Sequence, residues 1–180
     1  ELLKNKLSII VLAAGKGTRM QSDIPKVLHM VNNKSMIKHV LSQTDGLNPE
    51  KLIVVIGYEA QQLKNHLSDY NISFALQKEQ HGTAHAVMQC ANNLNKFKGS
   101  TLILSGDVPL ITSKTLQSLY KMHIDQNAHA SILSAKVENP YGYGRVLLKK
   151  NKVAKVVEEI HTTKSQKSIN LCNSGIMLVK

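Results

Sequence analysis

The hydrophobic positions of the first 130 residues form short apolar runs, which alternate with segments of helical spacing. Runs without clean alternation predict strands buried on both faces, and they occupy residues 7–12, 52–57, 72–77 and 101–104. Helical spacing predicts helices over residues 36–41, 59–67, 83–94 and 112–124, with Ser35 and either Thr112 or Ser113 as caps. Strands alternating with helices of this size predict an α/β fold, a Rossmann-like doubly wound and mostly parallel sheet.

The pattern changes after residue 130. A strand is expected over 131–137, followed by a β-hairpin of 144–149 and 152–158 around Lys150-Asn151. A polar stretch over 161–170 then precedes a last strand at 172–179. Because the chain stops beside that strand, residues 1–180 are expected to form one domain that is cut short at its C-terminal end.

Composition and charge narrow the classes of protein that need to be considered. The 180 residues are 42% hydrophobic, with no apolar run of membrane-spanning length and no signal-peptide pattern at the N-terminus. Two cysteines give no disulfide framework, so a cytoplasmic location is expected. The net charge of +11 favours anionic partners, but the lysines are scattered and aromatic residues are only 4%. We therefore expect no membrane and no nucleic acid, and we interpret the lysine-rich 149–155 as a solvated hairpin.

A loop of small residues follows the first apolar run, and its sequence is Leu12-Ala13-Ala14-Gly15-Lys16-Gly17-Thr18-Arg19-Met20, with Pro25-Lys26 beyond it. Two glycines and two alanines leave the backbone open to close approach. Successive N–H groups in such a turn can hold an anion, and Lys16, Arg19 and Lys26 add positive charge. The loop is therefore expected to wrap a polyphosphate.

Two common phosphate-binding motifs do not fit this loop. The dinucleotide fingerprint needs a third glycine where Met20 stands and an acid where Ser35 stands. The spacing of the P-loop is also absent. The sequence thus favours neither a nicotinamide enzyme nor a P-loop ATPase.

Other polar residues stand where apolar runs end. Asp107 follows the run 101–104, at the strand end where open α/β sheets bind ligands, and its carboxylate suits Mg²⁺; the alternative is a cap for the next helix. Gln77 ends the run 72–77, and its carboxamide offers a donor and an acceptor together, which suits the N3–H and O4 edge of uracil; the alternative is a satisfied amide at a strand end. Gly82-Thr83 opens a helix and presents backbone N–H groups, and the alternative for Thr83 is that it only caps this helix. His81 and His85 are interpreted as structural.

These residues, taken together, resemble a known family. The glycine loop with Pro25-Lys26 is similar to the signature of sugar-nucleotide pyrophosphorylases. The order of further motifs resembles the bacterial bifunctional N-acetylglucosamine-1-phosphate uridylyltransferases: Gln77, Gln80-His81-Gly82-Thr83-Ala84-His85-Ala86, Gly106-Asp107-Val108-Pro109-Leu110, Gly142-Tyr143-Gly144-Arg145, Glu158 and Asn173-Ser174-Gly175. The resemblance covers the whole chain and implies the fold of nucleotide-diphospho-sugar transferases.

The resemblance also implies roles for single residues. Arg19 and Lys26 would contact the phosphates at the reacting centre, and Asp107 would bind Mg²⁺, with a second ligand beyond Lys180. Nucleotide contacts would come from Leu12, Ala13, Ala14, Gly15, Gln77, Gly82, Thr83, Ser105 and Gly106. Gly144, Glu158 and Asn173 would hold the N-acetylglucosamine part. Glu159, next to Glu158 on an expected strand, would then face solvent.

The implied reaction joins UTP and N-acetylglucosamine-1-phosphate to give UDP-N-acetylglucosamine and pyrophosphate, a step toward peptidoglycan and lipopolysaccharide precursors. In this family the domain precedes a left-handed β-helix acetyltransferase, through which the enzymes form homotrimers. The resemblance covers the first domain only, so the present chain is expected to be a monomer or loosely associated. Three alternatives stay open: another sugar-1-phosphate nucleotidyltransferase, a non-catalytic nucleotide-binding module, and a nucleic-acid-binding protein. The segment after Glu158 departs from the family pattern.

Overall fold

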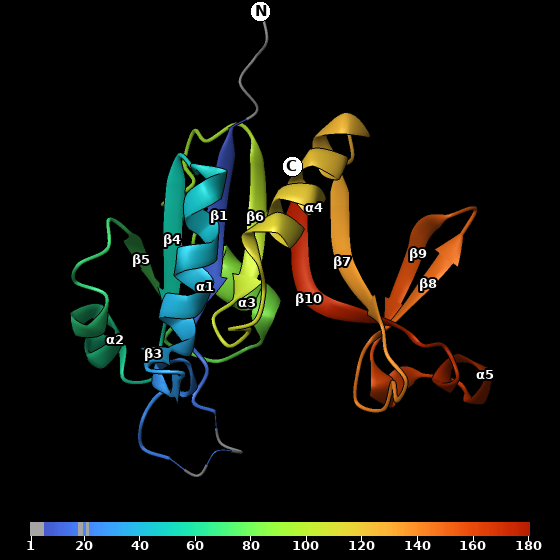
Figure 1. Ribbon diagram of the computed structural model, residues 1–180, viewed down its shortest axis with the longest axis horizontal. Coiled ribbons are helices and arrows are strands. Elements are labelled where there is room, and N and C mark those ends of the chain that lie inside the picture. Colours follow the sequence, from blue (N-terminus) through green and yellow to red (C-terminus); the bar gives the residue numbers. More distant parts are fainter. Residues whose placement is uncertain (1–5, 18–19, 21) are drawn as a thin grey trace, which may run out of the picture. The chain divides into compact units, whose positions relative to one another are not determined.

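The computed structural model describes residues 6–17, 20 and 22–180, and it divides into two compact units (Figure 1). Unit 1 comprises Glu1–Ala130 with Leu178–Lys180, and unit 2 comprises Ser131–Met177. Arg19, which the sequence predicts to contact phosphates, lies outside the described residues.

Unit 1 is built on a parallel sheet of four strands in the order β5-β4-β1-β6. Their bounds are β1 (Leu7–Leu12), β4 (Lys51–Ile56), β5 (Ser73–Leu76) and β6 (Ser100–Ser105). The central strands are almost wholly buried, as their continuous apolar runs require. These four strands confirm the four apolar runs predicted from the sequence.

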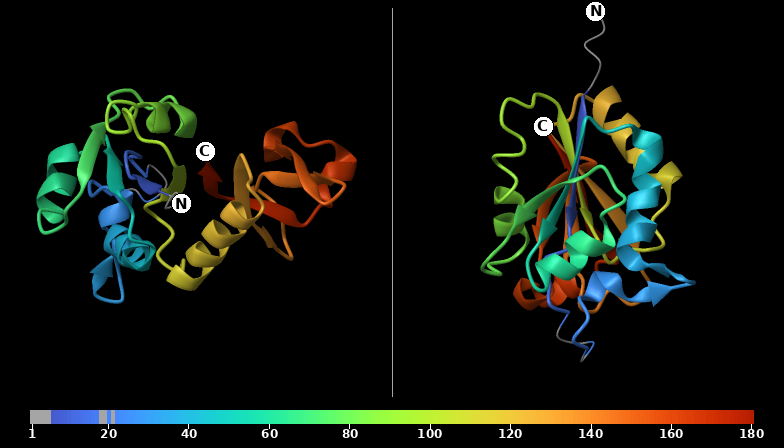
Figure 2. Two further views of the ribbon diagram at one scale, coloured as in Figure 1. Left: turned by 90° about the horizontal axis from the view of Figure 1, so that it is seen from above. Right: turned by 90° about the vertical axis from the view of Figure 1, so that its left-hand side faces the viewer.

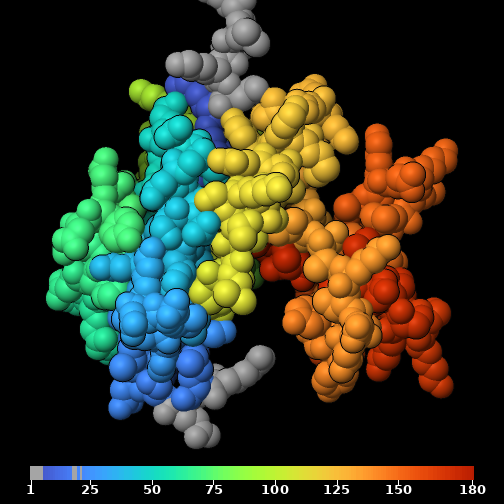
Figure 3. Space-filling view, in the orientation of Figure 1, coloured from blue at the N-terminus to red at the C-terminus, as the bar shows by residue number. Residues whose placement is uncertain are grey.

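Helices cover both faces of this sheet. Helix α1 (Met36–Thr44) lies on one face beside α4 (Ser113–Asp125), while α3 (Thr83–Met88) lies on the opposite face (Figure 2). Figure 3 shows α1 and α4 covering the strands from the first side. On the α3 face, Ala86 and Cys90 join a core cluster with Ile10, Ile53 and Val55. The doubly wound α/β fold is therefore confirmed.

Two local predictions about helix ends need correction. Ser35 precedes α1, but its hydroxyl bonds His66 Nε2 at 2.8 Å, at the end of α2 (Ala60–His66), and caps no backbone N–H. The helix predicted over 83–94 ends at Met88. The side chain of Gln89 donates to the His85 carbonyl, which a longer α-helix would give to the backbone N–H of Gln89. The predicted cap Thr112 is confirmed, because its hydroxyl accepts from Thr115 N–H.

A small ribbon between the glycine loop and α1 was not predicted. The 3₁₀ turn η2 (Lys26–Leu28) leads into β2 (Met30–Val31), which pairs with β3 (Lys34–Ser35) in antiparallel fashion. Asn32 and Asn33 connect the two strands with φ of 48° and 63°. Asparagine tolerates this left-handed region, so the pair Asn-Asn was the available signal for a tight hairpin.

Unit 2 is formed by antiparallel strands. Strand β7 (Ala130–Lys136) enters it, β8 (Arg145–Lys149) and β9 (Lys152–Val157) form a hairpin, and β10 (Leu171–Val179) pairs with β8. Lys150 and Asn151 turn the hairpin with φ of 49° and 59°, and the neighbouring lysines are exposed. The predicted hairpin is thus confirmed. The polar stretch contains the turn η4 (Glu159–His161) and the short helix α5 (Lys164–Lys167).

Within the part of the chain that the structure describes, we find no helix that is both long and apolar enough to span a membrane.

Candidate functional site

Lys26, Ser105 and Asp107 form a charged cluster in unit 1. Lys26 Nζ lies 2.5 Å from Asp107 Oδ2, and Ser105 Oγ donates to Asp107 Oδ1 at 2.6 Å. Ser105 ends β6 and Asp107 follows two residues later, while Pro25 starts the 3₁₀ turn in which Lys26 is the first residue. The structure therefore brings together one predicted phosphate ligand, the predicted metal ligand and one predicted nucleotide contact.

The environment of Asp107 keeps its carboxyl group ionised. Partial burial raises the pKa of this carboxyl group. The hydrogen bonds from Lys26 and Ser105, together with the positive charge of Lys26, lower the pKa by more than burial raises it, so the pKa lies below its usual value. The side chain of Asp107 is 26% exposed, which leaves its oxygens open to a ligand from solvent. An accessible carboxylate that stays charged is a suitable ligand for a hard cation.

This lowered pKa predicts a pH dependence of stability. Ionised Asp107 stabilises the folded state above the unfolded-state pKa of about 3.9, and this contribution is lost as the pH falls through the lower folded-state pKa. In EDTA, the free energy of unfolding of the wild type should thus fall more steeply than that of Asp107→Asn on acidification from pH 5 to pH 2. Urea unfolding at a series of pH values measures this difference, and parallel curves would contradict it.

The carboxyl ends of β1, β4 and β5 place a row of three residues side by side, namely Ala14, Gly57 and Gln77. The register pairs Leu12 with Val55 and Ile56 with Leu76, so the residues just beyond the strands continue the same rows. Tyr58 N–H donates to the Ala14 carbonyl, and Gln77 N–H donates to the Ile56 carbonyl. We call this row the nucleotide row. Gly57 at its centre was not among the predicted site residues.

Gly57 occupies a position where a side chain does not fit. A Cβ on Gly57 would lie 2.9 Å from both Ala14 Cβ and the Ala14 carbonyl oxygen, and 3.0 Å from the Gln77 carbonyl oxygen. Two of these three neighbours are backbone atoms of adjacent strand ends, which cannot move away cheaply. The available sequence signal was a glycine placed directly after a buried apolar strand.

Gln77 is buried and its orientation is fixed by its neighbours. Its Nε2 donates to the Gly82 carbonyl at 3.1 Å and lies 3.0 Å from His85 Nδ1. Because the amide nitrogen is directed at these protein groups, the amide oxygen is the atom left to accept from a ligand. The structure thus brings Gln77 and Gly82 together as predicted, but it restricts Gln77 to one of the two hydrogen-bonding roles considered.

The glycine loop lies against this row and against Lys26. Gln80 Nε2 donates to the Ala14 carbonyl at 2.7 Å, and Lys16 Nζ lies 5.1 Å from the centre of the Tyr58 ring. Gly17 has a φ of +67°, and a Cβ there would lie 2.6 Å from Lys26 Cβ. Gly15 is exposed, with open space where a Cβ would stand. Close approach to Lys26 explains why a glycine is needed at position 17.

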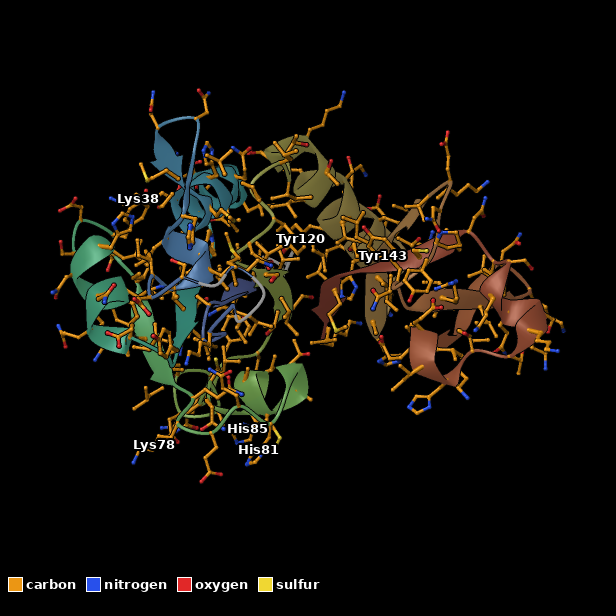
Figure 4. All side chains as sticks on the ribbon, turned by 90° about the horizontal axis from the view of Figure 1, so that it is seen from below. Lys38, Lys78, His81, His85, Tyr120 and Tyr143 are labelled. Carbon is orange, nitrogen blue, oxygen red and sulfur yellow. The ribbon has the colours of Figure 1, made fainter. Side chains whose placement is uncertain are left out.

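His81 and His85, next to the nucleotide row, contact each other and neighbouring polar side chains. Their rings meet edge to face with centres 5.2 Å apart, and Figure 4 shows them together near α3. His81 Nε2 also lies 2.8 Å from Glu79 Oε2, while His85 holds Gln77. These contacts agree with a structural role. Thr83 is exposed and is the first residue of α3, so it is not the cap; Gly82 takes that position with a φ of 91°.

A second row of three residues lies in unit 2. The register aligns Cys172 with Arg145 on β8 and Arg145 with Val157 on β9, so the next row holds Asn173, Gly144 and Glu158. Asn173 N–H donates to the Gly144 carbonyl at 2.8 Å, and a Cβ on Gly144 would lie 3.3 Å from Glu158 Oε1. We call this the sugar row, after the predicted role of its members. All three residues implied by the resemblance are brought together, with a glycine again at the centre.

The prediction for Glu159 was wrong. Strand β9 ends at Val157, and Glu158 precedes the 3₁₀ turn that contains Glu159, so the two acids do not alternate along a strand. Glu158 is exposed, whereas Glu159 is 20% exposed and lies 2.8 Å from Arg145 Nη2. Side chains alternate between the two faces only within a strand, so this alternation does not decide which of the two acids faces solvent.

Comparisons with known proteins place this chain among nucleotidyl transferases. The family model described as nucleotidyl transferase matches residues 8–176. The bifunctional protein GlmU of Prochlorococcus marinus (strain NATL2A) is 45% identical over 172 residues, covering 94% of this chain and 39% of the relative. That of Synechococcus sp. (strain JA-2-3B'a(2-13)) is 42% identical over 176 residues, covering 97% and 28%. The chain therefore spans well under half the length of these relatives.

A solved structure supports the fold. A Bacillus anthracis protein assigned as a glucose-1-phosphate thymidylyltransferase, in complex with a sucrose, aligns with a TM-score of 0.76 and 19% sequence identity. The alignment covers 97% of this chain and 71% of that chain. The likeness confirms the expected nucleotide-diphospho-sugar transferase architecture.

Proposed function

Because the chain belongs to the nucleotidyl transferase family, we propose that it is a domain that transfers UMP from UTP to N-acetylglucosamine-1-phosphate. The observation that carries the proposal is the cluster of Lys26, Ser105 and Asp107 beside a glycine-rich loop. A cation, a carboxylate and an open loop backbone at the ends of parallel strands are what a metal-bound triphosphate requires. The motif resemblance supports UTP and the N-acetylated sugar as the substrates.

The nucleotide row is proposed to bind the base. Gln77 presents its carboxamide oxygen because Gly82 and His85 hold its nitrogen, and a fixed acceptor matches the N3–H of uracil. Cytosine carries an unprotonated N3 at this edge, so two acceptors would face each other. This arrangement supports UTP over CTP as the nucleotide.

The residues around Asp107 fit a magnesium ion. Described residues include no group of three His, Cys, Asp or Glu side chains that could hold a metal ion, but Mg²⁺ commonly uses one or two carboxylates together with substrate phosphates. Ionised and partly exposed, Asp107 supplies such a carboxylate. When bound, the ion would neutralise charge on the phosphates of UTP. Lys26, now paired with Asp107, would be free to contact a phosphate once a cation takes its place.

The proposed reaction needs no activated nucleophile from the protein. A phosphate oxygen of the sugar phosphate attacks the α-phosphorus of UTP, the new O–P bond forms, and the bond to the β-phosphate oxygen breaks to release pyrophosphate. The attacking group is already an anion, so the contribution of the chain is positioning and charge stabilisation. Lys26 and Arg19 are proposed to stabilise the charge that accumulates on the phosphates.

The sugar row is proposed to bind the N-acetylglucosamine part. The Glu158 carboxylate lies against Gly144, and Asn173 pairs with the same glycine through its backbone N–H. The side chains of Glu158 and Asn173 offer hydrogen-bonding groups to sugar hydroxyls and amides. A methyl group on residue 144 would press on this carboxylate, so the position of Glu158 depends on the missing side chain.

Release of pyrophosphate from UTP tests the proposed function. With Mg²⁺, the release should depend on N-acetylglucosamine-1-phosphate and should be much slower with CTP or with glucose-1-phosphate. Because the chain spans 39% and 28% of its relatives, the assay is run on the chain and on a fusion with the following part of a relative. Release that is independent of the sugar phosphate, or no release from either protein, would overturn the proposal.

Gly144→Ala should weaken sugar binding selectively. The φ of Gly144 is not in the left-handed region, so alanine fits the backbone, but its methyl group would press on the Glu158 carboxylate. We expect the KM for N-acetylglucosamine-1-phosphate to rise about tenfold or more, at an unchanged KM for UTP. Steady-state kinetics with each substrate varied in turn measures the two constants, and equal changes in both would contradict the prediction.

A further inference from the structure

Arg145 is a fully buried cation that no predicted role explains. Its side chain is 1% exposed, and arginine is seldom buried without partners. Burying such a charge has a high desolvation cost, and well-packed apolar residues are often as stabilising as a buried ion pair. The contacts of the guanidinium therefore point to a role beyond stability.

The contacts of Arg145 converge on the turn that carries Gly144. Nη1 donates to the carbonyl of Tyr143, the residue directly before Gly144. Nη2 lies 2.8 Å from Glu159 Oε2 and donates to the Lys167 carbonyl at 3.3 Å. Three separate segments are thereby tied together: the 142–144 turn, η4 and the end of α5.

Glu159 completes the connection from the other side. Its Oε2 accepts from Gly142 N–H at 3.3 Å while pairing with Arg145. Gly142 has a φ of 84°, in the left-handed region that glycine reaches readily. Because glycine also reaches many other conformations, contacts with other segments are needed to hold the turn in this one. Arg145 thus holds the Tyr143 carbonyl and Glu159 holds the Gly142 N–H, both in the turn that leads to Gly144.

The guanidinium of Arg145 contacts the turn and Glu159, but its own hydrogen-bonding capacity is not fully used. Arg145 Nε is buried without a hydrogen-bond partner in the described part of the chain, which is an unfavourable state for a charged donor. The two other nitrogens are directed at the turn and at Glu159. The residue next to Glu159 in the chain, Glu158, remains exposed in the sugar row. Glu158 is therefore accessible to a ligand, whereas Glu159 bonds Arg145 and Gly142.

We propose that the Arg145–Glu159 ion pair positions the 142–144 turn, so that Gly144 stays in register between Asn173 and Glu158 for the sugar phosphate. The inference rests on the proposed function and extends it to two residues outside the sugar row. Small displacements of a binding group have large effects, so loosening the turn weakens binding of the sugar phosphate while UTP binding is unaffected.

Glu159→Gln is the sharpest test, because glutamine keeps the size and one acceptor oxygen but removes the charge. We expect the KM for N-acetylglucosamine-1-phosphate to rise about 10- to 100-fold at an unchanged KM for UTP. Backbone amides of residues 142–144 should also exchange hydrogen faster in the variant. Asp125→Asn, which removes the acid of an exposed ion pair with Lys121 on α4, is the matched control and should change neither measurement.

The outcomes separate this inference from the proposed function. If the wild type turns over both substrates but Glu159→Gln leaves the sugar-phosphate KM unchanged, or raises both KM values equally, the positioning role is wrong. If the wild type does not use the sugar phosphate, the proposed function fails and the inference with it, while amide exchange still reports whether the pair holds the turn. Arg145→Met serves as a second variant; should it not fold, Glu159→Gln decides alone.

Discussion

Asp107→Asn is expected to slow pyrophosphate release by about 10²- to 10³-fold, the effect of removing one charge-stabilising group from an active site. The amide keeps the shape of the carboxylate but is a poor ligand for Mg²⁺ and no longer carries the charge that pairs with Lys26. Most of the loss should appear in kcat, because charge accumulates on the phosphates mainly as the bond to pyrophosphate breaks. The measurement is a rate assay with saturating UTP over a range of Mg²⁺ concentrations.

The magnesium titration identifies the cause of that loss. If Asp107 binds the ion, the variant should need a higher Mg²⁺ concentration for half-maximal rate, and Mn²⁺ binding followed by electron paramagnetic resonance should weaken in parallel. Asp125→Asn makes the same chemical change at an exposed ion pair and should leave both readouts unchanged. A variant of Asp107 with normal turnover and normal metal dependence would show that this carboxylate does not bind the metal.

The strands could be predicted because their signal is local. The run 7–12 is apolar on both faces, and the structure buries it in the middle of the parallel sheet as β1. The turn at Lys150 and Asn151 was equally readable from the change of pattern around it. Helix ends were less predictable, since the Gln89 side chain competes for a carbonyl that the backbone would otherwise use. Such competition depends on one rotamer, which hydrophobic spacing does not encode.

The members of the candidate site could be named from the sequence, but their arrangement could not. Glu158 and Asn173 are far apart in the chain, and only the register of β8 with its two neighbours places both beside Gly144. The same limit explains the error at Glu159, because β9 ends before Glu158 and the partner of Glu159, Arg145, lies on β8. Gly57 was overlooked for a related reason: a glycine after a strand is common, and its need becomes visible only when Ala14 and Gln77 are seen on either side.

Both rows follow one structural principle. Each has a glycine at the centre, flanked at the ends of neighbouring strands by residues proposed to contact a ligand, and in each the missing side chain allows close packing. The consequences differ, however. A methyl group on Gly144 would meet the end of a carboxylate side chain, which can shift, whereas one on Gly57 would meet backbone atoms on two sides. Substitution of Gly57 should therefore have the larger effect on the fold.

Gly57→Ala is expected to destabilise unit 1 and to weaken UTP binding together. Contacts of 2.9 to 3.0 Å with Ala14 and Gln77 force the two strand ends apart, and overpacking of this kind costs about 1–3 kcal/mol of unfolding free energy. Displacing Ala14 and Gln77 moves the glycine loop and the proposed uracil acceptor at once, so the Kd for UTP should rise by about tenfold or more. Urea unfolding and calorimetric titration with UTP measure the two effects.

Gly46→Ala provides the matched control for this prediction. A Cβ on Gly46 would approach Gln117 Nε2 at 3.0 Å, which is as close as the contacts at Gly57, but the neighbour is the end of a flexible side chain that can rotate away. The same added methyl group should thus leave UTP affinity unchanged and alter the unfolding free energy by less than about 1 kcal/mol. Equal losses at Gly46 and Gly57 would mean that the methyl group acts through general strain. A loss confined to Gly57 would locate the effect in the row formed by Ala14, Gly57 and Gln77, and would tie the geometry of three parallel strand ends directly to nucleotide binding.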